Sequence, residues 1–277
     1  MTDALIGILI ARIRMREEIA DREKVADAVL DKMKHYTIGF ARAGETPAAK
    51  GSGVLIKHGG RYGILTCTHV DKYLRDLKRP IGIVRLNQGL AQQSATLEMD
   101  KVFSYAAGEE PWEGDDIAFI HLPPHLVGNI EKDCVFLDAD KNFTKPEPED
   151  FSSLLQVHSV FGLVEKFTGA TTRQGGRATT LLKGVLTSGV LREFDKLTAT
   201  LECFNENLAD LPSSFGGTSG GGLWRVYVRK RDDGSLEAVH HRLIGIASRE
   251  NINCTPPRIT CQGIGRIEAL LETSAAA

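Results

Sequence analysis

The segment SSFGGTSGGGLW, residues 213–224, places Ser219 among five glycines. Three interpretations fit such a loop. A flexible linker is disfavoured because Leu223 and Trp224 begin an apolar strand pattern immediately afterwards. A phosphate-binding loop is disfavoured because the Lys-Ser/Thr ending and the following helix are missing. The third interpretation, a nucleophilic serine, requires a base elsewhere in the chain.

A serine hydroxyl is a poor nucleophile unless a histidine accepts its proton, and that histidine needs a carboxylate to fix its tautomer. Among eight histidines, His69 stands out because it follows the apolar strand pattern of ILTCTHV. Asp116, in GDDIAFIHL, precedes a second apolar strand pattern. Either residue alone is more often structural than catalytic. Their joint occurrence with Ser219 favours catalysis.

The elements that must position these residues are mostly short strands. After Tyr36 the sequence consists of brief apolar runs broken by Gly, Asn and Asp, a texture typical of an all-β sandwich or barrel. HGGRYG predicts a hairpin that joins residues 54–56 to residues 64–66. RDDGS predicts a second hairpin, between residues 223–230 and a strand that ends at Ser248.

The remaining segments predict the boundaries of the domains. Apolar residues recur at helical spacing within residues 2–34, most clearly between Val25 and Met33, and Asp21 is a candidate N-cap. DADKNFTKPEPEDF is polar and aperiodic, which indicates a linker. IGRIEALLE predicts a short C-terminal helix. We therefore expect a helical extension (1–35), a first β domain (36–137), a linker (138–151) and a second β domain (152–277).

Composition excludes several function classes. The 277 residues are 42% hydrophobic and carry a formal charge of −2, so no global charge favours nucleic acid or an anionic membrane as a partner. No apolar run approaches the roughly 20 residues of a membrane span, and the N-terminus lacks the features of a secretory signal. Five cysteines without CxxC spacing argue for a reducing compartment and against structural zinc. We expect a cytoplasmic protein with no metal and no cofactor.

Four segments together resemble one family. GSGVLI with YGILTCTHV, then DDIAFIHLP, then GGTSGGGLW, and finally RLIGIAS are similar to the chymotrypsin-like, or trypsin-fold, serine peptidases, in which the chain order is His, Asp, Ser. The resemblance covers residues 36–267. It implies an all-β fold of two six-stranded antiparallel β-barrels, here preceded by the N-terminal helical extension.

The resemblance also implies an activity and its residues. It identifies His69, Asp116 and Ser219 as the catalytic triad of a serine endopeptidase that hydrolyses protein or peptide substrates through an acyl-enzyme. The backbone amides of Gly217 and Ser219 would form the oxyanion hole. Glycines suit this loop, because aiming two amides at one point often needs backbone conformations closed to other residues.

Substrate-binding residues follow from the same resemblance. They are Ser213, Ser248, Arg249, Glu250 and Gly263. The strand that contains GIASRE would pair with the substrate backbone. A carboxylate at Glu250 would favour a basic side chain before the cleaved bond. The alternative, in which Glu250 is a solvated surface charge, stays open.

Departures from the family pattern concern regulation. Thr218 stands where digestive members have an aspartate that pairs with a new N-terminus, so zymogen activation of that kind is not expected. The disulfides of secreted relatives are also missing. Both features indicate a stand-alone intracellular member of bacterial type. We expect its activity to be gated by a protein partner or by local disorder in the site loops, with the N-terminal helices as a docking element for the partner, as in a bacterial defence effector. Alternatively, these helices simply pack on the barrels.

Two other functions compete with this hypothesis. The chain could be a latent or non-catalytic peptidase fold that serves as a binding module. It could also be a serine esterase of the α/β-hydrolase class, since residues 217–221 satisfy GxSxG. That fold needs alternating strands and helices and the order Ser, Asp, His, which the β-rich texture and the few residues after Ser219 disfavour.

Overall fold

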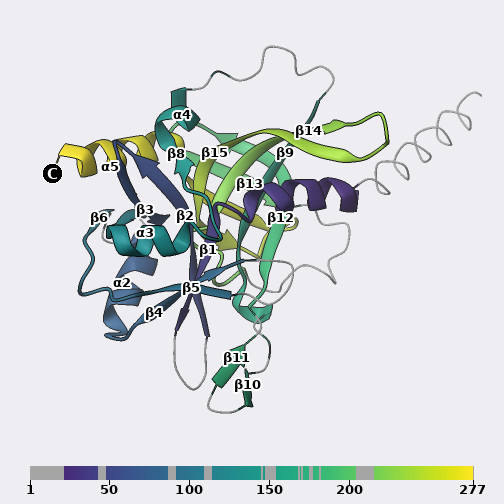
Figure 1. Cartoon of the computed structure of the whole chain (residues 1–277). Helices are drawn as coiled ribbons and strands as arrows, with labels where there is room; N and C mark the ends of the chain where they lie inside the picture. Colours follow the sequence, from purple (N-terminus) through teal and green to yellow (C-terminus); the bar gives the residue numbers. More distant parts are fainter. Residues whose placement is uncertain are drawn as a thin grey trace, which may run out of the picture.

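The computed structural model describes residues 22–42, 48–86, 92–108, 114–144, 146, 154–167, 169, 171–174, 177–180, 182–203 and 215–276. Asp21, Ser213 and the N-terminal part of the expected helical extension lie outside these ranges. The described chain is mostly β, with two sheets packed against each other and a few short helices at their margins (Figure 1).

The first sheet has eight strands. In chain order these are β1 (Thr37–Arg42), β2 (Ala48–His58), β3 (Arg61–Thr66), β4 (Ile81–Arg85), β5 (Gln92–Leu97), β6 (Ser104–Ala107), β7 (Ile117–His121) and β8 (Leu137–Asp138). Their spatial order is β5-β4-β1-β2-β3-β7-β6, and β8 pairs in parallel with β2. The sheet curls into a half-barrel.

This first sheet differs from the closed six-stranded barrel that the sequence predicted, because within the described residues β5 and β6 are not paired. Helix α2 (Thr68–Asp76) packs against β6 and bonds to the chain between the two strands. Its Arg75 guanidinium donates to the carbonyls of Met99 (2.7 Å) and Val102 (3.3 Å), and to the Ser104 hydroxyl (2.8 Å). Carbonyls of this connection are thus satisfied by a side chain and not by a strand ladder.

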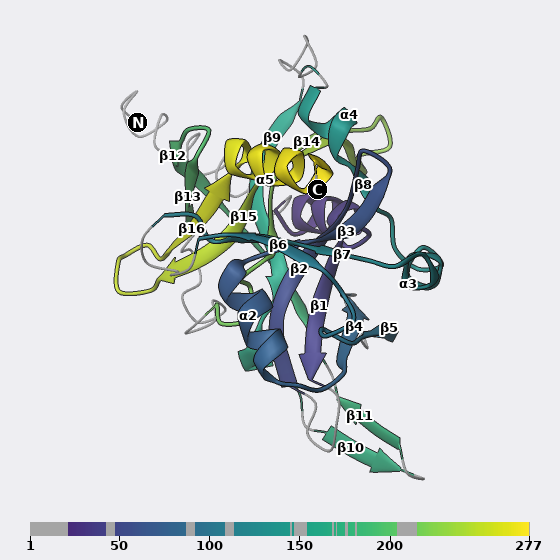
Figure 2. The ribbon, with the colours of Figure 1, turned by 90° about the vertical axis from the view of Figure 1, so that its left-hand side faces the viewer.

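The second sheet is a closed six-stranded antiparallel barrel, as expected. Its strands are β9 (Leu155–Leu163), β12 (Gly184–Phe194), β13 (Thr198–Cys203), β14 (Gly222–Lys230), β15 (Leu236–Asn251) and β16 (Arg258–Gly263), in the spatial order β12-β13-β16-β15-β14-β9. A separate hairpin, β10 (Thr171–Gln174) and β11 (Arg177–Thr180), projects away from both sheets in Figures 1 and 2.

Both predicted hairpins are confirmed. Val54 pairs with Leu65 across the HGGRYG turn, in which Gly59 and Gly60 take the positive φ that glycine tolerates. Val228 pairs with Ala238 across the RDDGS turn. Turn chemistry is local, so the sequence contains the information that fixes these two pairings.

Short helices fill the margins. Besides α2 they are α3 (Pro124–Ile130), α4 (Ala139–Thr144), the 3-10 turn η1 (Glu165–Phe167) and α5 (Ile264–Ala276). The expected C-terminal helix is therefore present. It packs against strands of both sheets, β6 and β7 on one side and β15 and β16 on the other (Figure 2). The segment expected as a linker from residue 138 begins with the end of β8 and then α4.

A helix over residues 22–33 precedes β1 and packs into the main hydrophobic core. Val29 and Met33 are fully buried there, together with side chains of both sheets. Just after the helix, Tyr36 lies 5.6 Å from the Trp224 ring and 5.1 Å from the His241 ring, centroid to centroid. This helix is thus part of the folded body.

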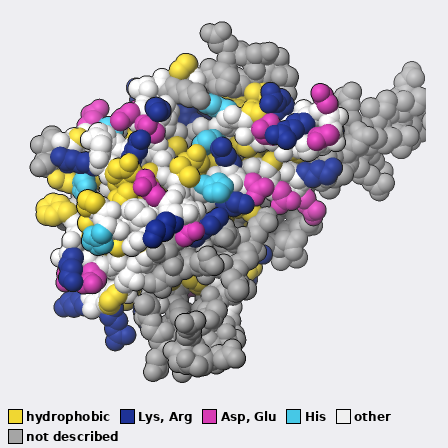
Figure 3. Space-filling model, in the orientation of Figure 1, with side chains coloured by type: hydrophobic (Ala, Val, Ile, Leu, Met, Phe, Trp, Pro, Cys, Tyr) yellow, Lys and Arg dark blue, Asp and Glu magenta, His cyan; other side chains and the backbone are white. Residues whose placement is uncertain are grey.

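The surface carries no single dominant charge on the face drawn in Figure 3, where basic and acidic side chains are interspersed with apolar ones. Inside the closed barrel a second, smaller core contains Val160, Leu201 and Leu223. Among the described helices, none combines the length and the apolarity that a membrane crossing requires.

Candidate active site

His69 lies in the first turn of α2, where the strand β3 ends. Cys67 is extended and caps the helix, and Val70 and Leu74 bury its inner face, so His69 points from the margin of the core with a third of its side chain exposed (33%). The Thr68 hydroxyl lies within hydrogen-bonding distance of the carbonyls of Ala107 (2.8 Å) and Ile117 (3.0 Å). These contacts fix the start of the helix against β6 and β7.

Asp116 precedes β7 and is almost fully buried, with 1% of its surface exposed. Both of its carboxylate oxygens contact His69. Oδ2 lies 2.8 Å from the ring Nδ1, and Oδ1 accepts the His69 backbone N–H at 3.1 Å. Arg266 of α5 contacts the preceding residues, Asp115 (2.6 Å) and Gly114 (3.1 Å). The carboxylate is therefore held in place, and it favours the His69 tautomer with its proton on Nδ1 and a free Nε2.

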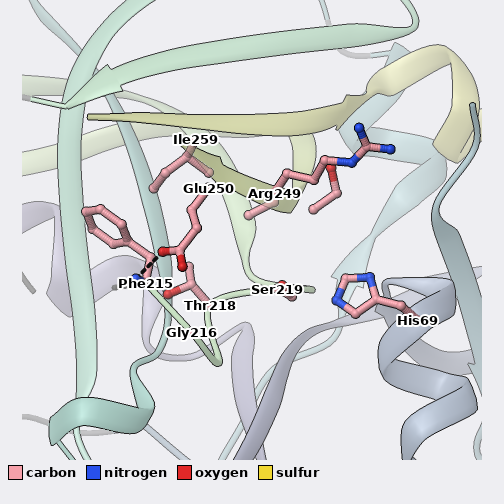
Figure 4. Close-up of a pocket in the computed structure, with 10 residues that line it drawn as sticks. His69, Phe215, Gly216, Thr218, Ser219, Arg249, Glu250 and Ile259 are labelled. Carbon is pink, nitrogen blue, oxygen red and sulfur yellow. Dashed lines mark hydrogen bonds between the residues drawn. The ribbon is translucent and has the colours of Figure 1, made fainter. Parts of the chain in front are cut away.

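Ser219 faces this pair across the junction of the two sheets. Figure 4 shows its side chain beside the imidazole of His69, at the mouth of a cavity of about 270 Å³ that both residues line. Ser219 lies in the loop that leads into β14, a strand of the closed barrel. His69 and Asp116 come from the first sheet. The structure thus brings together the three residues that the sequence predicted.

The backbone around Ser219 forms a tight turn. The Thr218 N–H donates to the Phe215 carbonyl (2.9 Å), and Gly217 has a φ of +92°, which is the pattern of a type II turn and needs glycine at that position. The Gly216 carbonyl accepts the Glu165 N–H (2.8 Å). Because a trans peptide points its C=O and N–H in opposite directions, the Gly217 N–H points away from Glu165.

Two amides of this loop, those of Gly217 and Ser219, have no hydrogen-bond acceptor within the described residues. Their neighbours are all paired, since Thr218, Gly220 and Gly221 donate to Phe215, Ala247 and Thr218 respectively. Two unpaired amides on either side of Thr218 suit the binding of an oxyanion.

The cavity next to Ser219 contains three of the five predicted substrate-binding residues. Ser248, Arg249 and Glu250, on β15, line it together with His69, Phe215, Gly216, Thr218, Ser219, Ala247 and Ile259. Gly263 is not among these lining residues; its amide donates to the Leu197 carbonyl at the end of β16. Ser213 lies outside the described residues.

Glu250 is the acidic side chain of this cavity. Figure 4 shows it between Phe215 and Thr218, while the Arg249 guanidinium points toward the side of His69. The Glu250 carboxylate accepts a hydrogen bond from the Phe215 N–H. Phe215, Ala247 and Ile259 provide apolar surface nearby. A carboxylate in such a setting attracts a cationic group.

One group of side chains has ligand atoms close enough for a metal ion. Within the described residues, atoms of Cys67, His69 and Asp116 lie within 4.8 Å of one another. The Cys67 thiol, however, donates to the Ala247 carbonyl (3.0 Å), and burial raises its pKa well above the usual range. Metal binding requires the thiolate, so this set fits the His69–Asp116 hydrogen bond better than a metal.

The sequence does not predict the apolar residues that line the cavity, nor one buried residue that contacts the loop around Ser219. Phe215, Ala247 and Ile259 come from three segments, and no local motif links them. Ser52 of β2 contacts the loop around Ser219 although 165 residues separate it from Gly217. A serine in a strand has no sequence signature of such a contact.

Comparisons with known proteins do not assign this chain to a family. No protein-family model matches the sequence, and no curated protein matches it. One similar solved structure comes from work on how aromatic interactions drive the coupled folding and binding of the intrinsically disordered Sesbania mosaic virus VPg protein. The TM-score is 0.42 and the identity 14%, over 83% of this chain and 86% of that one. A structural similarity this weak does not identify a family or a function.

Proposed function

We propose that the chain is a serine endopeptidase. The observation that carries the proposal is the buried Asp116 carboxylate, whose Oδ2 lies 2.8 Å from Nδ1 of a partly exposed His69 that faces Ser219. A buried carboxylate can fix the orientation of the imidazole through Nδ1. The exposed part of the imidazole can then reach a substrate.

In the proposed mechanism, the Ser219 Oγ attacks the carbonyl carbon of a peptide bond while His69 Nε2 takes its proton. The Gly217 and Ser219 amides, which lack other acceptors within the described residues, donate to the oxyanion. His69 then gives the proton to the leaving amine. Water attacks the acyl-enzyme with His69 again as the base, which releases the acid and restores Ser219.

Substrate backbone would bind along β15. The pairing of β15 with β14 ends at Ile246, and residues 249–251 pair with β16. The other edge of this segment borders the cavity that Ser248 and Glu250 line. An extended peptide added at this edge would bring its carbonyl toward Ser219 and its side chain into the cavity.

The test is labelling with a fluorophosphonate probe, followed by hydrolysis of a peptide library. We expect the wild type to be labelled and to cleave amide bonds, and Ser219→Ala and His69→Ala to do neither. Ser188→Ala, which removes a hydroxyl bonded to Ser159 between strands β9 and β12, serves as the control and should match the wild type.

Two outcomes would contradict the proposal. Labelling that persists in Ser219→Ala would assign the nucleophile elsewhere. A wild type that stays unlabelled with and without a partner protein would favour the alternative of a latent fold that acts as a binding module. We also propose gating by a protein partner, and a wild type that is labelled only once a partner is added would support that gating and would not count against the peptidase.

A further inference from the structure

We infer that Ser52 is a positioning residue that sets the orientation of the oxyanion-binding amides; the inference rests on the proposed function. Ser52 lies on β2 of the first sheet and is fully buried. Its hydroxyl donates to the Gly217 carbonyl (2.8 Å) and accepts the Leu163 N–H (2.7 Å). Its backbone N–H donates to the Ser219 carbonyl (2.8 Å). One residue of the first sheet thus binds both loop residues whose amides are unpaired.

The geometry of the peptide unit explains how Ser52 acts on these amides. A planar trans peptide fixes the direction of its N–H once its C=O is bound. The Ser52 hydroxyl binds the C=O of the Gly217–Thr218 peptide, and the Thr218 N–H on the opposite side closes the turn to Phe215. This turn holds Gly217 at a φ of +92°, so that its own amide remains available. Ser52 therefore selects one arrangement of the turn.

The same residue links the nucleophile loop to the strand that leads to His69. The Thr66 hydroxyl, three residues before His69, donates to the Ser52 carbonyl at 2.7 Å. Ser52 consequently contacts β3 on one side, and β9 and the Ser219 loop on the other. These bonds place the base and the nucleophile in one hydrogen-bonded unit although they belong to different sheets.

Close packing leaves Ser52 little freedom to adopt another arrangement. A Cβ atom added at Gly220 would lie 2.0 Å from the Ser52 carbonyl oxygen, and one added at Gly162 would lie 2.9 Å from its hydroxyl oxygen. Both glycines allow the loop and β9 to approach Ser52. A buried hydroxyl with both hydrogen bonds made constrains the peptide that it binds.

The experiment compares Ser52→Ala with Ser159→Ala. Ser159 is a matched control because it is also fully buried and its hydroxyl is bonded, to Ser188 at 2.7 Å, away from the loop. We expect Ser52→Ala to lower kcat on a peptide substrate about 10- to 100-fold with KM within about twofold, since the transition-state contacts are displaced while substrate binding persists. Ser159→Ala should keep kcat within about threefold.

A second readout does not depend on activity. Hydrogen exchange of the peptide segment 215–222, followed by mass spectrometry, should be at least about tenfold faster in Ser52→Ala than in the wild type or Ser159→Ala. Where alanine leaves too little folded protein, Ser52→Cys fills the space with a weaker donor and should shift exchange in the same direction.

Each outcome bears on one claim. Unchanged kcat together with unchanged exchange in Ser52→Ala would overturn the role of Ser52. Faster exchange with a lowered kcat would support it. If the wild type neither cleaves peptides nor reacts with the fluorophosphonate, the proposed function fails, and the exchange comparison alone decides whether Ser52 holds the loop.

Discussion

At the scale of single residues, the buried Asp116 is the most constrained member of the site. Both of its oxygens contact His69, one through the ring and one through the backbone N–H. Its neighbour Asp115 is half-exposed and contacts Arg266. Two adjacent carboxylates thus have separate partners, and the resemblance to the peptidase family selects Asp116 because it directly precedes the apolar strand.

Asp116→Asn is expected to lower kcat about 10⁴-fold. The amide group of asparagine would favour the wrong histidine tautomer, with the proton on Nε2, so that His69 could no longer accept the Ser219 proton. Steady-state kinetics on a peptide substrate measure the effect. Asp232→Asn, at an exposed position in the RDDGS turn, is the control and should stay within about threefold of the wild type. Equal losses in the two variants would contradict this role of Asp116.

Glu250→Gln tests which side chain the cavity selects. Glutamine keeps an oxygen that can accept the Phe215 N–H but removes the charge. We expect kcat/KM for a substrate with arginine before the cleaved bond to fall about 10- to 100-fold, as for the loss of a charge-assisted contact. A matched substrate with neutral citrulline should be unaffected. An unchanged arginine-to-citrulline ratio would leave Glu250 without a part in selectivity.

At the scale of elements, the turns of the hairpins could be predicted from the sequence, whereas contacts between residues far apart in the chain could not. The two hairpins follow from the glycines and aspartates of their turns, which the sequence displays directly. Next to the open side of the first sheet, the Arg75 guanidinium binds carbonyls 24 and 27 residues later. The hydrogen bonds of Ser52 to Gly217 and Leu163 form only where the two sheets pack against each other. Such contacts leave no periodic pattern in the chain.

The helix over residues 22–33 offers an element-scale prediction. Met33 is fully buried in the main core, so Met33→Ala should lower the free energy of unfolding by about 2–4 kcal/mol. Urea denaturation measures the change. Glu23→Ala, on an exposed position of the same helix, should stay within about 0.5 kcal/mol. A negligible effect of Met33→Ala would mean that the helix is held only loosely.

At the scale of the whole molecule, the cysteines show how the fold controls thiol chemistry. Cys67, Cys134, Cys203 and Cys261 are buried free thiols, whereas Cys254 is partly exposed. Burial raises the pKa of Cys134 to about 11 and that of Cys203 to about 12, and it raises the pKa of Cys67 and Cys261 as well. At neutral pH these four groups are therefore protonated and unreactive.

Native alkylation should consequently modify one residue. Iodoacetamide at pH 7.5 is expected to label Cys254 and to leave the four buried thiols unmodified, because only thiolates react at a useful rate and burial also blocks access. In guanidinium chloride all five cysteines should react. Intact-mass measurement followed by peptide mapping reads out both states. Rapid native labelling of Cys67 would show that the junction between the sheets opens readily.

The hydrogen bonds of Ser52 across that junction have a consequence for how the chain could be divided. The first half supplies His69 and Asp116, and the second half supplies Ser219 and the amides that we propose bind the oxyanion. Neither half holds a complete site. If the two were produced as separate polypeptides, cleavage activity would rise with the product of their concentrations and would report their association, as in a complementation assay.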